Sequence, residues 1–85
     1  MMQVGTHFTG TVTAGATKRW FAPQWPASWH VVWYAVPLTN GAGAPQLELK
    51  VQVERSSTDH LTYWLDVRNL GSAEMNFEMR YAIMG

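Results

Sequence analysis

The amino-acid sequence predicts an all-β protein, a small antiparallel β-sandwich of about six strands that forms one domain over residues 1–85. Three observations predict this fold class. The second half of the chain alternates apolar and polar side chains with the period of two that half-buried strands show. Short turn sequences rich in Ser, Asn and Gly separate the alternating runs. Prolines and β-branched residues disfavour a helix in the tryptophan-rich middle of the chain.

The first part of the chain predicts two weaker strands. Residues 6–14 alternate threonines with apolar or small side chains, and this run ends near Gly15. The segment Thr17–Phe21 predicts a second, shorter strand. Together with the four stronger runs described below, these segments account for the sandwich.

Four tryptophans lie within fourteen residues of the middle segment: Trp20, Trp25, Trp29 and Trp33. The last three are four residues apart, a spacing that fits one face of a helix or of a strand. Pro23 and Pro26 disfavour the helix. We therefore interpret residues 29–36 as a strand with apolar side chains on both faces, ended by Pro37. Such a strand is central in its sheet or has one face covered by another subunit. Residues 38–46 predict a flexible loop.

The second half of the chain contains the clearest strands, at residues 47–54, 61–69 and 75–84. In the second of these, Leu61 begins an apolar face and Thr62 begins a polar one. Polar turns separate the three runs. Because antiparallel strands joined by short connections usually pair with each other, we expect these three strands to form a meander.

The small size of the chain predicts self-association. A chain of this length buries only about 60% of its unfolded surface. It contains no cysteine, so disulfides cannot stabilise it, and its formal net charge of zero does not oppose association. Oligomerisation is then the remaining common way to stabilise a small scaffold. The candidate interface residues lie at the apolar strand: Trp29, His30, Trp33 and Tyr34.

Charge and motif content argue against several kinds of partner. No basic stripe predicts binding to nucleic acid, and no apolar stretch is long enough to insert into a membrane. The N-terminal segment lacks the charged and apolar regions of a signal peptide, which leaves the localisation open. His7, His30 and His60 lack metal-ligand spacing, and nothing indicates a metal or another cofactor.

A candidate ligand site lies on the polar face of the strand at 61–69. Trp64, Asp66 and Arg68 project from this face, with about 7 Å between successive members. An aromatic ring beside a carboxylate and a guanidinium suits a sugar, because the ring stacks on C–H groups and the charged groups bind hydroxyls. Two other interpretations fit the same pattern, a ladder of cross-strand charge pairs and a subunit interface. Further residues complete the candidate ligand site: Lys50, Asn69 and His60.

No catalytic motif is present, so we expect the protein not to be an enzyme. A nucleophile needs a base and a group that orients the base. Ser28 lies two residues from His30, but side chains at that spacing on a strand are parallel neighbours. Paired carboxylates for glycoside hydrolysis need a deep cleft, which a sandwich of this size rarely provides.

Four segments carry a recognisable pattern, in this order: VGTHFTGTVTAG, RWFAPQWPASWHVVWYAVP, LKVQVERSSTDHLTYWLDVRN and MNFEMRYAIMG. They resemble successive blocks of the H-type lectins, the family of snail agglutinins and discoidin C-terminal domains. The first is similar to the family's opening V-x-S-G strand, and the last to its closing V-x-V-x-W-x-A strand. The resemblance implies a six-stranded antiparallel sandwich that forms trimers, sometimes paired into hexamers, and binds N-acetylgalactosamine or a related sugar.

Some positions depart from this family. His60 and Leu61 stand where its hairpin usually carries Gly-Phe. The family's sugar-contacting arginine and histidine lie on the two strands of that hairpin. Lys50 is the nearest basic residue in the first strand, and Arg68 or Asn69 stands near the histidine position of the second. The resemblance therefore implies the fold and the trimer more directly than the same sugar specificity.

A second resemblance implies a different use of the same fold. The phrase LDVRNLGSAEMNFEMRY looks like immunoglobulin-like bacterial adhesion domains, which often carry V-x-N-x-G-S before a final strand. The leading expectation is a carbohydrate-binding, lectin-like protein that acts as a multivalent homo-oligomer, a trimer or hexamer. The alternatives are a structural subunit of a larger particle, tail or filament, and an adhesion module without a small ligand.

Overall fold

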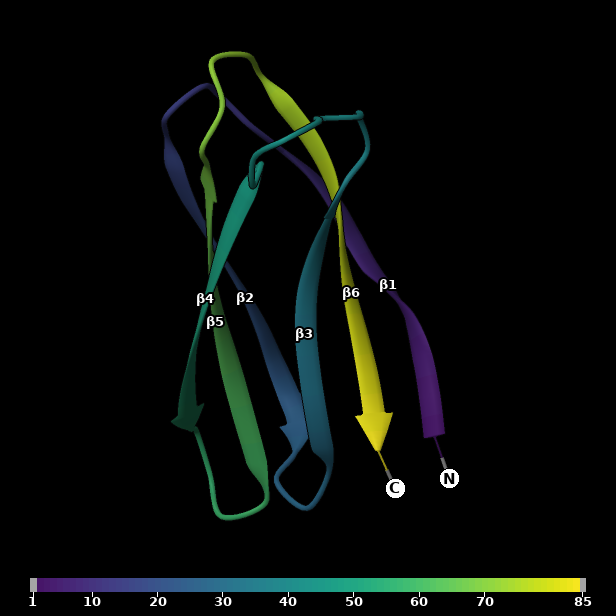
Figure 1. Cartoon of the computed structure of the whole chain (residues 1–85). Coiled ribbons are helices and arrows are strands. Elements are labelled where there is room, and N and C mark those ends of the chain that lie inside the picture. The colour runs from purple at the N-terminus through teal and green to yellow at the C-terminus, as the bar shows by residue number, and fades with distance from the viewer. Residues whose placement is uncertain (1, 85) are drawn as a thin grey trace.

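The structure, a computed structural model, describes residues 2–84 as six strands in two layers (Figure 1). The strands are β1 (Met2–Val12), β2 (Thr17–Pro26), β3 (His30–Pro37), β4 (Leu47–Arg55), β5 (His60–Asn69) and β6 (Met75–Met84). They form two antiparallel sheets, sheet A with the order β1-β6-β3 and sheet B with the order β2-β5-β4. The predicted all-β sandwich is confirmed. Within the described residues, no helix is long and apolar enough to cross a membrane.

The predicted meander is wrong in one connection. β4 and β5 pair as an antiparallel hairpin, from Leu47 opposite Asn69 to Arg55 opposite Leu61. β6 instead lies in sheet A between β1 and β3, so the chain crosses between the sheets after β5. The alternation of side chains shows which face of a strand is buried, but it does not show which strand lies beside it.

Asn69 holds this crossover in place. Its side chain is fully buried. The amide Nδ2 donates to the carbonyl oxygens of Val12 at 2.9 Å and Ala73 at 2.7 Å, and Oδ1 accepts from the Gly71 amide at 2.9 Å. One side chain thereby joins the end of β1, the end of β5 and the crossover turn.

β2 is longer than the predicted strand Thr17–Phe21, and it lies at the edge of sheet B, where prolines do not have to end a strand. It continues past Phe21 to Pro26 and contains a bulge between Ala22 and Trp25, where Gln24 has a φ of 66°. Prolines are tolerated in edge strands, where a missing N–H breaks no ladder hydrogen bond. They therefore mark the edge of sheet B here, and not the end of the strand.

β3 is also an edge strand, so of the two alternatives that the sequence allowed the central position is wrong, and coverage of one face by another subunit stays a prediction. It pairs with β6 alone in sheet A. Trp33 points inward and is buried, whereas Val32 and Tyr34 are exposed on the outer face. One face of β3 is therefore apolar because it packs in the core. The other face carries apolar side chains that are exposed to solvent in the single chain.

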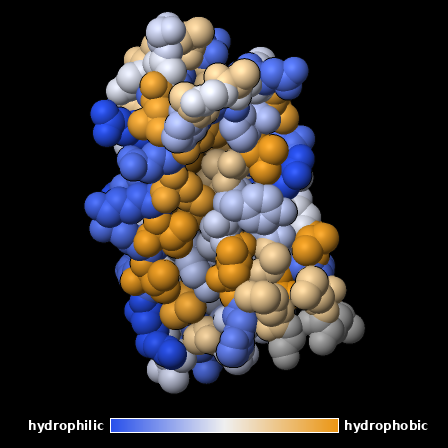
Figure 2. Space-filling view, viewed as in Figure 1, coloured by the Kyte–Doolittle hydropathy of each residue, from blue (hydrophilic) through white to orange (hydrophobic). Residues whose placement is uncertain are grey.

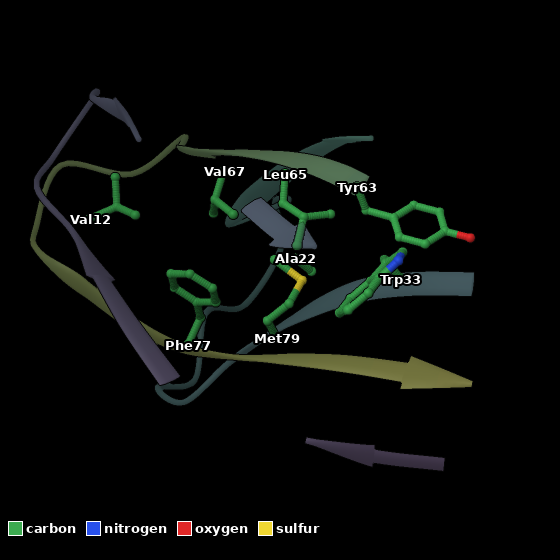
Figure 3. Close-up of a cluster of buried hydrophobic side chains, with 8 residues drawn as sticks. All are labelled: Val12, Ala22, Trp33, Tyr63, Leu65, Val67, Phe77 and Met79. Atoms are coloured by element: carbon green, nitrogen blue, oxygen red, sulfur yellow. The ribbon is translucent and has the colours of Figure 1, made fainter. Parts of the chain in front are cut away.

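The core lies between the two sheets (Figure 3). Its buried side chains are Val12, Ala22, Trp33, Tyr63, Leu65, Val67, Phe77 and Met79. Trp33, which the sequence placed among the candidate interface residues, is 6% exposed and belongs to this core. Trp20 and Trp25 pack against the core, and Trp29 is exposed at the turn before β3.

β1 approaches the core closely because it carries glycine where ring side chains meet its backbone. A Cβ atom on Gly10 would lie 2.9 Å from two atoms of the Phe77 ring and 3.0 Å from the Trp20 ring. Both rings therefore rest directly against the main chain of β1.

Candidate functional site

The outer face of sheet B is built from the outward side chains of its three strands. Because β5 lies in the middle, each outward residue of β5 has one neighbour on β2 and one on β4. The rows across the sheet are Thr17, Arg68 and Glu48; Arg19, Asp66 and Lys50; and Phe21, Trp64 and Gln52. Trp64, Asp66, Arg68 and Lys50, all predicted at the candidate ligand site, share this face.

Arg19 and Asp66 form the centre of the polar part of this face. Arg19 Nε donates to Asp66 Oδ1 at 2.6 Å, and Nη2 donates to Asp66 Oδ2 at 3.0 Å. Nη2 also donates to Gln52 Oε1 at 2.8 Å. The hydrogen bonds from Arg19 lower the pKa of Asp66 against the opposing effect of burial, and the charges of Arg19 and Lys50 lower it further. Asp66 is therefore an ionised carboxylate with a fixed orientation.

The exposed Phe21 and the half-buried Trp64 form an aromatic ledge beside this ion pair. Their ring centroids are 5.4 Å apart, with an angle of 34° between the planes. Phe21 is 59% exposed. Trp64 Nε1 donates to Glu54 Oε1 at 2.9 Å, and the Arg19 guanidinium lies 5.5 Å from the Trp64 ring centroid. These contacts hold the Trp64 ring in one orientation on the outside of the sheet.

A shallow depression of about 240 Å³ adjoins the ion pair on the side away from the ledge. Its lining residues are Thr17, Glu48, Lys50, Asp66 and Arg68. Among residues 2–84 the ion pairs are Arg19–Asp66 and Glu78–Arg80, so Lys50 and Arg68 keep their donors for solvent or a ligand. The outer face of sheet B thus combines an apolar ledge, a fixed carboxylate and two cationic groups.

Two predicted ligand residues lie elsewhere. Asn69 points into the protein and uses its amide at the crossover, so its prediction as a surface contact is wrong. His60 begins β5 at the far end of the sheet. Its Nδ1 lies 3.3 Å from Ser57 Oγ. A second depression of about 520 Å³ surrounds it, lined by Pro26, Ala27, Ser28, Arg55, Thr58, Asp59 and His60.

The sequence analysis missed the contribution of β2 and part of that of β4 to the outer face. Arg19 and Phe21 supply the ion pair and half of the ledge, and Gln52 and Glu54 accept hydrogen bonds from the groups on β2 and β5. The alternation of Arg19 and Phe21 with Trp20 was present in the sequence. This alternation does not show that β2 pairs with β5, which is what brings Arg19 and Phe21 beside Asp66 and Trp64.

The outer face of sheet A carries a second notable surface, which is apolar. Rows of neighbours across this sheet run Met2, Met84 and His30, and then Val4, Ala82 and Val32. The exposed members with large apolar side chains are Met2, Val4, Val32 and Met84, followed by Tyr34 in the next row. Figure 2 shows this group over the lower ends of β1, β6 and β3. Of the candidate interface residues, Tyr34 belongs to this surface and His30 borders it.

No group of three or more His, Cys, Asp or Glu side chains that could hold a metal ion occurs in the part of the chain that the structure describes. Comparison with known proteins finds no matching family model, no matching curated protein and no matching solved structure.

Proposed function

We propose that the protein is a carbohydrate-binding, lectin-like protein that acts as a multivalent homo-oligomer. The observation that carries the proposal is the Phe21–Trp64 ledge with the Arg19–Asp66 pair beside it. The apolar C–H face of a pyranose ring stacks on exposed aromatic rings. Hydroxyl groups at the edge of the same sugar reach carboxylate and guanidinium groups, which form the stronger charge-assisted hydrogen bonds.

The shallow form of the face supports multivalent action. A flat site with few contacts binds one sugar weakly, and linking several such sites in one particle raises the overall strength without new contacts. We propose a trimer or hexamer, with the apolar outer face of sheet A as a subunit contact. Five large apolar side chains are exposed there, and burying them removes apolar surface from water.

Glycan binding by the purified protein and a set of ring variants tests the proposal. Trp64→Ala and Phe21→Ala should each abolish the signal on a glycan array, whereas Trp64→Phe should retain part of it because a ring remains. Trp29→Ala removes an exposed ring at the turn before β3, away from the ledge and from the five side chains of the proposed subunit contact, and is the matched control for the loss of an aromatic side chain. Absence of any glycan signal from the unaltered oligomer would refute the proposal.

A specific observation favours a second function, that of a structural subunit of a larger assembly. Both carboxylate oxygens of Asp66 and the Trp64 indole N–H already have partners within the protein. In a purely structural face such a ladder needs no ligand. If the unaltered protein gives no glycan signal and Trp64→Ala and Arg19→Ala alter the size of the assembly, the structural function is the correct one.

A further inference from the structure

The four edge strands differ in how they are protected against pairing with another strand. Free edges are normally blocked by bulges, prolines or charges. β1 has a bulge between Thr6 and Phe8, and β2 has one between Ala22 and Trp25 beside two prolines. β3 and β4 pair with their neighbours without irregularity, but β3 ends in a proline. β4 contains neither proline nor glycine over its nine residues, and it is the most regular open edge.

The inner face of β4 is only half covered. Leu47 and Leu49 pack against the core. Val51 and Val53 point to the same side but are 38% and 59% exposed. Figure 2 shows a stripe of hydrophobic side chains along the β4 side of the molecule. Two apolar side chains that should face a second sheet therefore face water in the single chain.

The backbone of β4 is ready to bind another strand on its open side. The Leu70 amide donates to the Gln46 carbonyl, and the Ser56 amide donates to the His60 carbonyl. With the observed register, these bonds direct the N–H and C=O groups of even-numbered residues toward β5. The odd-numbered residues of β4, Val51 and Val53 among them, direct theirs outward.

We propose that β4 pairs in antiparallel orientation with β4 of a second copy of this chain, about a twofold axis at Gln52. Opposite residues in an antiparallel pair lie on the same face of the sheet. With the axis at Gln52, Val51 lies opposite Val53 of the second copy. Lys50 lies opposite Glu54 of the second copy, and symmetry repeats both contacts. The two copies then share one six-stranded sheet with the order β2-β5-β4-β4-β5-β2.

Charge selects this register over its neighbours. An axis at Lys50 places two lysines against each other, and an axis at Val51 places Glu48 against Glu54. An axis at Val53 places the exposed Val51 against the charged Arg55 and forms no opposite-charge pair, whereas the axis at Gln52 places only the half-buried Leu49 against Arg55. An axis at Leu49 pairs Glu48 with Lys50, but it leaves the most exposed valine of the strand opposite Pro45, outside β4. Of these axes, the one at Gln52 both pairs the two exposed valines with each other and forms two opposite-charge pairs.

This contact uses an edge of sheet B and does not rest on carbohydrate binding. It is separate from the apolar outer face of sheet A, so one copy can use both surfaces. A twofold contact combined with a threefold contact makes a hexamer, which is one of the two assemblies proposed above. Because association can be measured without sugar, its failure and that of the carbohydrate proposal are distinguishable.

Charge reversal tests the register. Lys50→Glu and Glu54→Lys each convert two attractive pairs into two repulsive ones, and each should raise the dissociation constant of this contact roughly tenfold or more. A mixture of the two variants restores both attractive pairs, so native mass spectrometry should show mixed dimers in place of homodimers. Glu48→Lys changes the same face of the same strand without entering the pair, and it is the matched control. The proposal is overturned if a mixture of the two variants forms no mixed dimers, or if Glu48→Lys raises the dissociation constant as much as the other two substitutions do.

Disulfide trapping tests the position of the twofold axis at Gln52, and association through the outer face of sheet A does not affect the result. The natural sequence has no cysteine, so Gln52→Cys introduces one thiol per chain. Opposite residues in an antiparallel pair have Cα atoms about 4.5–5.5 Å apart, within the range that a disulfide spans. Glu48→Cys places the two thiols roughly 27 Å apart by strand rise. On mild oxidation the first variant should run as a covalent dimer and the second as a monomer, and equal cross-linking would refute the axis.

Discussion

Replacement of Asn69 with alanine removes three hydrogen bonds from the point where the chain crosses between sheets. The carbonyl oxygens of Val12 and Ala73 lose their donor, and the Gly71 amide loses its acceptor. Asn69 is fully buried, so water reaches these groups only if the crossover opens. Each hydrogen bond contributes about 0.5–1.5 kcal/mol net, so the three together are worth about 3 kcal/mol.

That loss is large for a chain of this length. Domains of 85 residues have a free energy of unfolding of about 4–13 kcal/mol at typical values per residue. At about 4–8 °C per kcal/mol, Asn69→Ala should lower Tm by on the order of 15 °C. Asn69→Asp should be at least as harmful, because it keeps the acceptor for Gly71 but turns a carboxylate toward two carbonyl oxygens.

Thermal unfolding followed by circular dichroism measures the shift, and urea unfolding followed by tryptophan fluorescence checks it. The slope of the urea transition should be unchanged, which shows that stability was lost and not compactness. Folded Asn69→Ala at low temperature should bind any ligand of the outer face of sheet B like the unaltered protein. A Tm within about 3 °C of the original, well under the ~4–8 °C expected for even 1 kcal/mol, would refute the structural role of Asn69.

Three further predictions concern the core and the polar face. Gly10→Ala should lower the free energy of unfolding by about 1–3 kcal/mol, because the added methyl group meets the Phe77 ring. A urea midpoint equal to that of the original protein would contradict this close contact. Leu65→Ala, at a fully buried position, should cost about 2–5 kcal/mol in the same assay, and a cost under about 1 kcal/mol would contradict the assigned core. Arg19 lowers the pKa of Asp66, so the pair stabilises the fold above the unfolded-state pKa of Asp, about 4, and this stability is lost as pH falls through the lower folded-state pKa. The Tm difference between the protein and Asp66→Asn should therefore shrink in acid, and a difference that stays constant between neutral pH and about pH 2 would exclude this linkage.

The strands of the second half were predictable because each has one buried and one solvated face. The predicted runs 47–54 and 61–69 differ by one residue from β4 and β5, and the run 75–84 coincides with β6. The edge strands β1 and β2 were predicted less well. Bulges interrupt their alternation, and prolines in β2 resemble an end signal although an edge strand tolerates them.

The candidate site was predictable within one strand and not across strands. Strand periodicity alone places Trp64, Asp66 and Arg68 on one face. The partners Arg19 and Phe21 come from pairing between strands that are far apart in the sequence, which periodicity does not contain. Asn69 shows a signal that was present but overlooked, because it continues the inward alternation of Val67.

The pairing of Met2 with Met84 brings the beginning and the end of the described chain to one corner of the sandwich (Figure 1). A short linker between the two ends would therefore allow circular permutation, with new ends opened in the loop between β3 and β4 and all four strand pairings kept. The same corner borders the apolar outer face of sheet A. A bulky fusion partner at either end would thus act as a steric cap on that face, and an affinity tag placed there would change the assembly that it was meant to purify.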